Sequence, residues 1–111
     1  LSRIKQDRTD SFDLVICNQV VEHLPDSLVD KFVAKLAAHT ERTLIVSTTF
    51  ELEQGAIKGH VQDPISEAEF RSWFSKFAPR DTGKLEIVFS GDKFGGRFRP
   101  KMNIIGVWTR L

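Results

Sequence analysis

Cysteine is almost absent from this sequence: the 111 residues contain one, so no intrachain disulfide can form. We therefore expect a reducing compartment, with the cytoplasm as the default. Strong charge of one sign is also lacking, and a formal net charge of +1 argues against binding to nucleic acid or membranes through bulk electrostatics. No apolar run approaches the roughly 18 residues that a membrane-spanning helix needs. The first residues also lack the basic-then-apolar pattern of an export signal.

The composition is that of a globular protein, with 41% hydrophobic and 10% aromatic residues. At this length the chain is one small domain or a piece of one. The polar segment Leu1–Ser11 is typical of the tail of a preceding element followed by a loop. Because domains rarely begin so abruptly on a buried strand, we expect further sequence upstream.

The first apolar run organises the rest of the chain. The segment Phe12–Asn18 is too short for a helix and too continuously apolar for a half-solvated strand. It therefore predicts a parallel strand buried on both faces. The polar residues Asn18 and Gln19 end the run, and open α/β sheets bind their ligands at the carboxyl ends of such strands. Glu22 and His23 follow at once, so a site is expected at this tip.

A parallel crossover follows the first strand. Apolar residues at three- and four-residue spacing predict a helix over 26–38, and a second short buried strand is expected over 43–47. Strand, helix and strand at this spacing form a right-handed parallel unit. The segment 50–64 carries two glycines and no apolar period, so it is expected to be a loop in the position of a lid.

The last part of the chain predicts a helix and a hairpin. Ser66 caps the helix, and its apolar stripe continues until Pro79 ends it; the stripe consists of Phe70, Trp73, Phe74 and Phe77. Strands are expected over 85–89 and 103–108. Their glycine-rich connection is too short for a helical crossover, so these two strands should pair antiparallel.

The quoted residues also carry a resemblance to a known family. Phe12-Asp13-Leu14-Val15, followed by Val20-Val21-Glu22-His23-Leu24-Pro25, resembles the fourth strand and following loop of class I S-adenosylmethionine (SAM)-dependent methyltransferases. The group that includes the ubiquinone-pathway O-methyltransferases is the most similar. The resemblance implies an α/β fold: residues 1–111 form the C-terminal half of a Rossmann-like domain. Its sheet would be mostly parallel with a closing antiparallel hairpin, its last strand would insert between its two predecessors, and its helices would lie on one face.

The cofactor-binding half of that family is absent from this sequence. Its glycine-rich turn and the acidic residue that accepts the ribose hydroxyls are both missing. The glycines at 91, 95 and 96 have the wrong spacing and link two strands. We therefore expect this chain alone to be inactive and unable to complete a SAM pocket. An apolar sheet face and the strand edge Phe12–Cys17 would be left open, which predicts self-association there.

The resemblance assigns roles to the residues of the expected site. It places three residues on the cofactor side: Cys17, Asn18 and Gln19. Thr48, Thr49 and His60 would line the substrate side. His23 is the candidate general base for a substrate hydroxyl, with Glu22 orienting its ring. The plainer alternative is that Glu22 caps the helix and His23 packs at the rim, while Cys17 is a small buried hydrophobe.

A metal site is a further alternative. The small-RNA 2′-O-methyltransferases hold a divalent metal with a Glu-x-x-Glu-His motif and a later histidine, to which Glu22, His23 and His60 correspond. Here Gln19 stands at the first position. Because loss of an anionic oxygen weakens a hard-cation site, no metal is predicted.

Three functions follow from the resemblance. The first is a SAM-dependent methyltransferase that acts on a small-molecule oxygen or nitrogen nucleophile. The second is a non-catalytic, methyltransferase-like association module. The third is an RNA-modifying methyltransferase, which the mixture of aromatic and basic residues in the hairpin would suit; these are Phe94, Arg97, Phe98, Arg99 and Lys101. In a nearly neutral domain such a hairpin is usually a solvated loop, so nucleic-acid binding is not expected.

Overall fold

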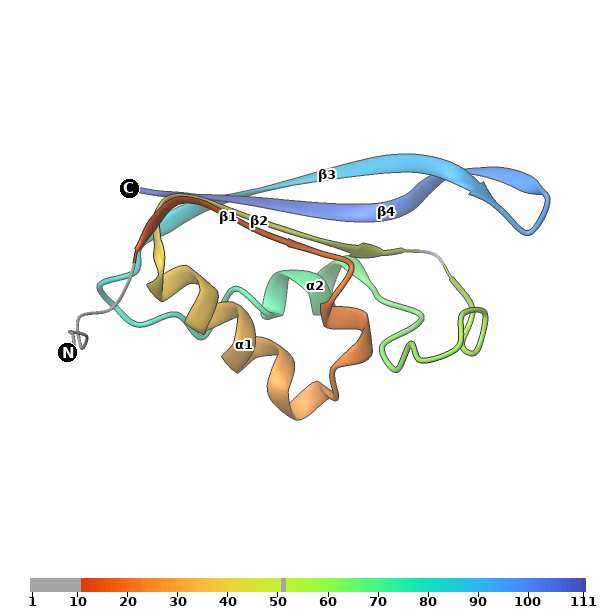
Figure 1. The fold of residues 1–111 in the computed structure, drawn as a ribbon, viewed down its shortest axis with the longest axis horizontal. Helices are drawn as coiled ribbons and strands as arrows, with labels where there is room; N and C mark the ends of the chain where they lie inside the picture. Colours follow the sequence, from red (N-terminus) through yellow and green to blue (C-terminus); the bar gives the residue numbers. More distant parts are fainter. Residues whose placement is uncertain (1–10, 51) are drawn as a thin grey trace, which may run out of the picture.

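The computed structural model describes residues 11–50 and 52–111, which form a four-stranded sheet with two helices on one face (Figure 1). The strands are β1 (Phe12–Asn18), β2 (Thr40–Thr49), β3 (Gly83–Phe94) and β4 (Arg97–Arg110). The helices are α1 (Asp26–Ala38) and α2 (Glu67–Ser72), and a short 3-10 helix, η1 (Val21–His23), follows β1. Neither α-helix is long and apolar enough to cross a lipid bilayer.

The sheet has the order β1-β2-β4-β3, so β4 inserts between its two predecessors as expected. β1 and β2 are parallel and connected through α1, which confirms the predicted crossover. β4 runs antiparallel to both β2 and β3. The sheet is therefore mixed: β1, β2 and β3 run in the same direction, and the inserted strand β4 is antiparallel to both its neighbours, so the expectation of a mostly parallel sheet with a closing antiparallel hairpin is confirmed only in part.

Each strand after the first is longer than its apolar run. β2 extends beyond 43–47 because its ends still find partners, with Thr40 opposite Phe12 and Thr49 opposite Asn103. β3 and β4 continue past the body of the sheet as a two-stranded ribbon. Apolar patterning marks the buried part of a strand, whereas backbone pairing continues into polar residues that the pattern does not identify.

The second helix is shorter than predicted. It begins as expected, with the Ser66 hydroxyl accepting a hydrogen bond from the Glu69 amide at 3.0 Å. It ends at Ser72, well before Pro79. The hydroxyls of Ser72 and Ser75 donate to nearby backbone carbonyls, and serines that bond the backbone in this way compete with helix continuation.

The core lies between the helices and the sheet. The expected aromatic stripe belongs to it although most of the stripe lies beyond the helix: Phe77 packs edge-on against Trp108, with ring centroids 5.3 Å apart. Phe70 is fully buried and lies over the backbone of Gly106, where an added Cβ would be 2.8 Å from the ring. A larger residue at position 106 would therefore force the Phe70 ring to move.

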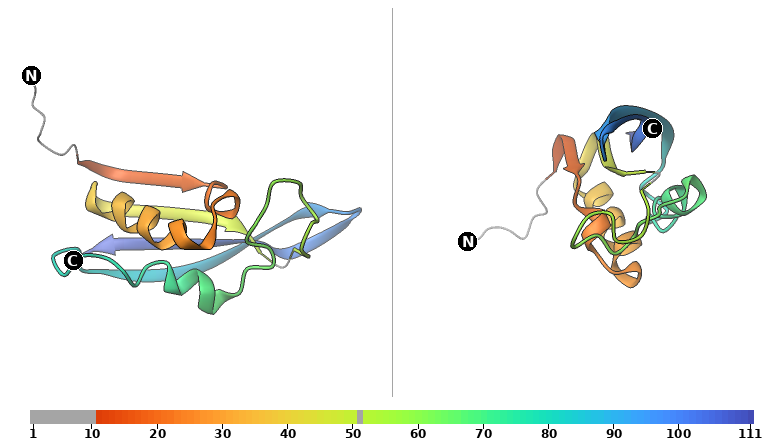
Figure 2. Two further views of the ribbon diagram at one scale, coloured as in Figure 1. Left: turned by 90° about the horizontal axis from the view of Figure 1, so that it is seen from below. Right: turned by 90° about the vertical axis from the view of Figure 1, so that its right-hand side faces the viewer.

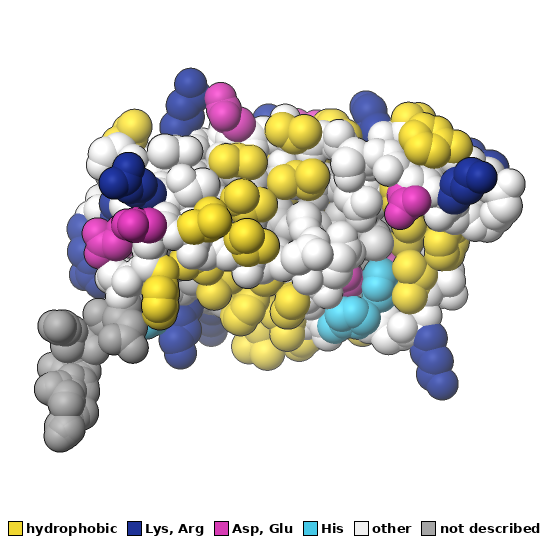
Figure 3. All heavy atoms as spheres, turned by 45° about the horizontal axis from the view of Figure 1, so that its top comes forward, with side chains coloured by type: hydrophobic (Ala, Val, Ile, Leu, Met, Phe, Trp, Pro, Cys, Tyr) yellow, Lys and Arg dark blue, Asp and Glu magenta, His cyan; other side chains and the backbone are white. Residues whose placement is uncertain are grey.

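The opposite face of the sheet is open. Phe12, Leu14 and Ile16 are 55%, 53% and 60% exposed, and β1 is the edge strand. The prediction that β1 is buried on both faces is therefore wrong, because no described element covers its second face or pairs with its outer edge. Apolar side chains gather on this side of the molecule (Figure 3). The bare face and edge expected of a half-domain are present.

Candidate functional site

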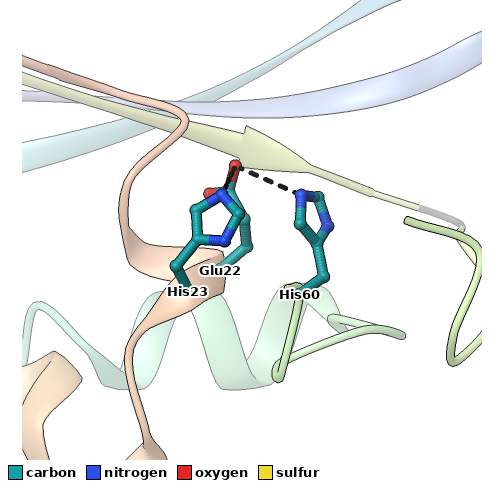
Figure 4. A group of neighbouring side chains, drawn as sticks. All are labelled: Glu22, His23 and His60. Atoms are coloured by element: carbon teal, nitrogen blue, oxygen red, sulfur yellow. Dashed lines mark ion pairs between the residues drawn. The ribbon is translucent and has the colours of Figure 1, made fainter. Parts of the chain in front are cut away.

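Glu22 is the centre of the candidate site. It lies in η1, immediately after β1, and its side chain is 1% exposed. The Thr48 hydroxyl on β2 donates a 2.6 Å hydrogen bond to its Oε1. The other oxygen, Oε2, is directed at two imidazoles: it lies 4.0 Å from His23 Nε2 and 3.8 Å from His60 Nε2 (Figure 4). A buried carboxylate thus has one oxygen satisfied and one facing two ring nitrogens.

His23, whose side chain is 49% exposed, is hydrogen-bonded to the loop that carries Gly59. Its Nδ1 lies 2.9 Å from the carbonyl oxygen of Gly59. Since a carbonyl only accepts hydrogen bonds, Nδ1 must carry the proton, and in the neutral ring Nε2 keeps its lone pair. Gly59 has a φ of 89°, a backbone conformation that favours glycine. The same loop is attached to η1 through the Val61 amide, which donates to the Glu22 carbonyl at 2.8 Å.

His60 is fixed in the same way by a carboxylate. Its Nδ1 lies 2.7 Å from Asp63 Oδ2, and Asp63 Oδ1 accepts a 3.1 Å hydrogen bond from the Thr49 hydroxyl. The side chains of His60 and Asp63 are 5% and 1% exposed. An ionised carboxylate only accepts, so His60 Nδ1 donates to Asp63, and the other ring nitrogen, Nε2, faces Glu22.

The three groups form an arrangement that could hold a metal ion. One nitrogen from each ring and a carboxylate oxygen converge, and these three possible ligand atoms lie within 4.8 Å of one another. Their separations from Glu22 exceed the 2.7–3.2 Å or so of a direct N–H···O bond. Histidines whose second nitrogen donates to a carboxylate or backbone carbonyl are characteristic of metal sites.

None of the residues expected on the cofactor side is a member of this cluster. Cys17 belongs to the hydrophobic core, where burial, and secondly the charge of Glu22, raise the pKa of its thiol. The side chain of Asn18 accepts a hydrogen bond from the Ser47 hydroxyl. Gln19 has a φ of 57° and donates from Nε2 to Asn103 Oδ1 at 3.0 Å. Their contact with a cofactor stays a prediction.

The residues expected on the substrate side divide into two groups. His60 is itself a member of the cluster. Thr48 and Thr49 are buried and support it from β2, through their bonds to Glu22 and Asp63. Asp63 itself was missed by the sequence reasoning. The spacing of an acid three residues after His60 is the signal that could have found it.

The comparisons with known proteins give the fold a wider context. No family model and no curated protein matches the sequence. Among solved structures, the small RNA methyltransferase HEN1 superposes with a TM-score of 0.66 and 23% identity, covering 94% of this chain. Magnesium protoporphyrin IX methyltransferase from Synechocystis PCC 6803, with bound SAM, superposes with a TM-score of 0.61 and 19% identity over 92%. The methyltransferase domain of a bacterial Hen1 gives 0.59 and 20% over 94%.

The fold is that of a class I methyltransferase. The more specific similarity to ubiquinone-pathway O-methyltransferases has no counterpart among these structures. The chain spans only part of each of them: 40% of the protoporphyrin enzyme, 14% of HEN1 and 56% of the bacterial domain. The chains of these neighbours therefore extend well beyond the part that this chain resembles.

Proposed function

We propose that this chain is the C-terminal half of a SAM-dependent O-methyltransferase domain whose acceptor is a hydroxyl group of RNA. The observation that supports this most is the convergence of Glu22 and His23, in η1, with His60, from the loop between β2 and α2. It corresponds to the second Glu, the His and the later His of the metal motif in small-RNA 2′-O-methyltransferases. HEN1, a small RNA methyltransferase, is also among the solved structures of similar fold.

The donor set fits a divalent metal ion even without the first acidic residue. Glu22 would supply one carboxylate oxygen, and His23 and His60 one Nε2 each, with both rings already held in the required tautomer. Two imidazole nitrogens and one carboxylate favour a first-row transition metal such as Mn²⁺ or Zn²⁺ over Mg²⁺. When bound, such an ion lowers the pKa of a coordinated hydroxyl and orients it for attack.

The chain's own residues perform the positioning. Thr48 on β2 holds the carboxylate, while Asp63 and Gly59, both in the loop, hold His60 and His23. With both Nδ1 atoms donating, the two Nε2 atoms face the space in which the acceptor hydroxyl would lie. Methyl transfer is an in-line displacement, so most of the rate enhancement comes from such orientation.

SAM would be bound only in part by this chain. Asn18 and Gln19 lie at the carboxyl end of β1, where the fold places its ligands, and would form one wall of the pocket. The glycine-rich turn and the ribose-binding acid must come from another segment. A small-molecule acceptor remains the second candidate, because the protoporphyrin methyltransferase shares the fold at a similar TM-score.

The test is methyl transfer by the chain joined to the cofactor-binding half of its domain. Labelled SAM would be supplied with a short single-stranded RNA, and the same RNA with its terminal ribose 2′-O-methylated is the control acceptor. We expect labelling of the first RNA alone, its loss with a chelator, and its recovery with Mn²⁺. In the Glu22→Gln variant, Mn²⁺ should not restore the labelling of the RNA. Transfer that is unaffected by the chelator, or absent from RNA while a small-molecule acceptor is labelled, contradicts the proposal.

A further inference from the structure

The ribbon formed by the ends of β3 and β4 stands clear of the rest of the sheet. β2 makes its last pair with β4 at Asn103, and the register shifts between Ser90 and Asp92. Beyond that shift only β3 and β4 pair with each other, and Gly95 and Gly96 close the ribbon with φ values of 66° and 81°. Figures 1 and 2 show the ribbon extending past both helices. We call residues 91–101 the ribbon tip.

Positive charge is concentrated in the ribbon tip. It contains four basic residues and one acid, Asp92, and so carries a charge of +3; the basic residues are Lys93, Arg97, Arg99 and Lys101. Since the whole chain carries +1, the other 100 residues together carry −2. Lys93, Arg97 and Lys101 are exposed. The near-neutral balance of the sequence therefore conceals a local cationic surface, and this surface can attract a polyanion.

An exposed aromatic ring lies among these charges. Phe98 is 59% exposed. Its ring lies over Gly91 on the neighbouring strand, where an added Cβ would be only 2.4 Å from Phe98 Cζ. A glycine opposite an aromatic residue is a known way to shield a bare backbone. Here it also holds the ring in place opposite Lys93, which pairs with Phe98 across the ribbon.

The ribbon tip is connected to the candidate site. Arg99 Nη2 lies 3.7 Å from Glu53 Oε2, and the Phe50 amide donates to the Met102 carbonyl at 2.7 Å. These contacts tie the ribbon to the loop that carries Gly59 and His60. The loop and the ribbon tip lie at the same end of the molecule (Figure 2). The ribbon is therefore joined to the loop that carries His60 at this end of the molecule.

We propose that the ribbon tip binds single-stranded RNA, with Lys93, Arg97 and Lys101 contacting phosphates and Phe98 stacking on a base. This inference rests on the proposed function for its choice of ligand. Cations interleaved with an exposed aromatic ring are the combination that single-stranded nucleic-acid binders use. Bound in this way, the strand would present its terminal hydroxyls to the histidine cluster.

The test is fluorescence anisotropy of a single-stranded oligoribonucleotide, labelled at its 5′ end, with the 111-residue chain in EDTA. Three phosphate contacts predict a slope of about −2 for log K against log salt. Replacing Lys93, Arg97 and Lys101 together by Gln should remove most of that slope and weaken binding at low salt more than about 10-fold. Phe98→Ala should weaken it between about 5- and 100-fold, and Phe98→Trp should retain it.

The matched control replaces three exposed lysines away from the tip by Gln: Lys31, Lys35 and Lys84. It changes the net charge equally and should leave the affinity unchanged. No RNA binding at low salt, equal losses in both triple variants, or binding to anionic vesicles in preference to RNA overturns the inference. Because EDTA removes any metal, these outcomes are independent of the histidine cluster. Intact RNA binding without methyl transfer by the completed domain would instead contradict the proposed function.

Discussion

Removing the carboxylate of Asp63 should weaken metal binding although Asp63 is not one of the proposed ligands. Its side chain is 1% exposed and accepts from His60 Nδ1 at 2.7 Å and from Thr49 at 3.1 Å. In Asp63→Ala the His60 ring is free to rotate and to adopt the other tautomer. Loss of such an outer partner typically costs 10- to 100-fold in metal affinity, or about 1.4–2.7 kcal/mol.

Calorimetric titration of Mn²⁺ into the folded variants measures this loss. Asp63→Asn keeps an acceptor oxygen for His60, so its loss should stay below about 10-fold. Asp92→Ala removes an exposed carboxylate in the ribbon tip and should leave the affinity unchanged. Circular dichroism establishes that each variant is folded. If Asp63→Ala binds Mn²⁺ within a factor of two of the unaltered chain, the reasoning about His60 is refuted.

Three further predictions concern the core and the open face. The Cys17 thiol should react slowly with iodoacetamide in the folded chain and faster in Glu22→Gln, since burial and the Glu22 charge both raise its pKa; an equal rate in both would contradict this. Ile16→Lys should shift a self-associating chain toward the monomer in sedimentation, because that side chain is 60% exposed on the edge strand; a chain that is monomeric to begin with would remove the premise. Gly106→Ala should destabilise the fold by about 1–3 kcal/mol in urea unfolding, because the new methyl group would overlap Phe70; an unchanged midpoint would show that the core can relax.

The order of elements could be predicted because each depends on local signals. Three local signals each predict one element: a strand from the apolar run at 12–18, a helix from the periodicity of 26–38, and an antiparallel pair from the short connection after 89. The structure has all three. The end of α2 could not be predicted from its aromatic stripe. Phe74 and Phe77 serve the core equally well from a turn, and the serines at 72 and 75 bond the backbone there.

The exposure of one face of β1 could not be predicted from its sequence. Its sequence carries apolar residues on both faces, as a central strand of a complete domain does. The described residues supply a cover for one face only, which leaves Leu14 and Ile16 exposed. The apolar residues on both faces of β1 are thus typical of a strand in a larger sheet than the one that the described residues form.

The candidate site could be predicted in part. The adjacency of Glu22 and His23 after a strand, and a histidine in the lid loop, follow from the sequence. The role of Asp63 and the tautomers of both histidines depend on how residues 59–63 fold back over η1. The absence of a metal was expected because Gln19 replaces an acid. In the structure Gln19 bonds Asn103, and three donor atoms converge without it.

The most direct test of the central claim is pulsed electron paramagnetic resonance of Mn²⁺ added to this chain at one equivalent. If Glu22, His23 and His60 together bind the ion, its spectrum should show nitrogen couplings from two imidazoles. One coupling should disappear in His23→Ala and one in His60→Ala, and Glu22→Gln should release most of the ion. A spectrum identical to that of aqueous Mn²⁺, or couplings that survive both histidine substitutions, would contradict the account.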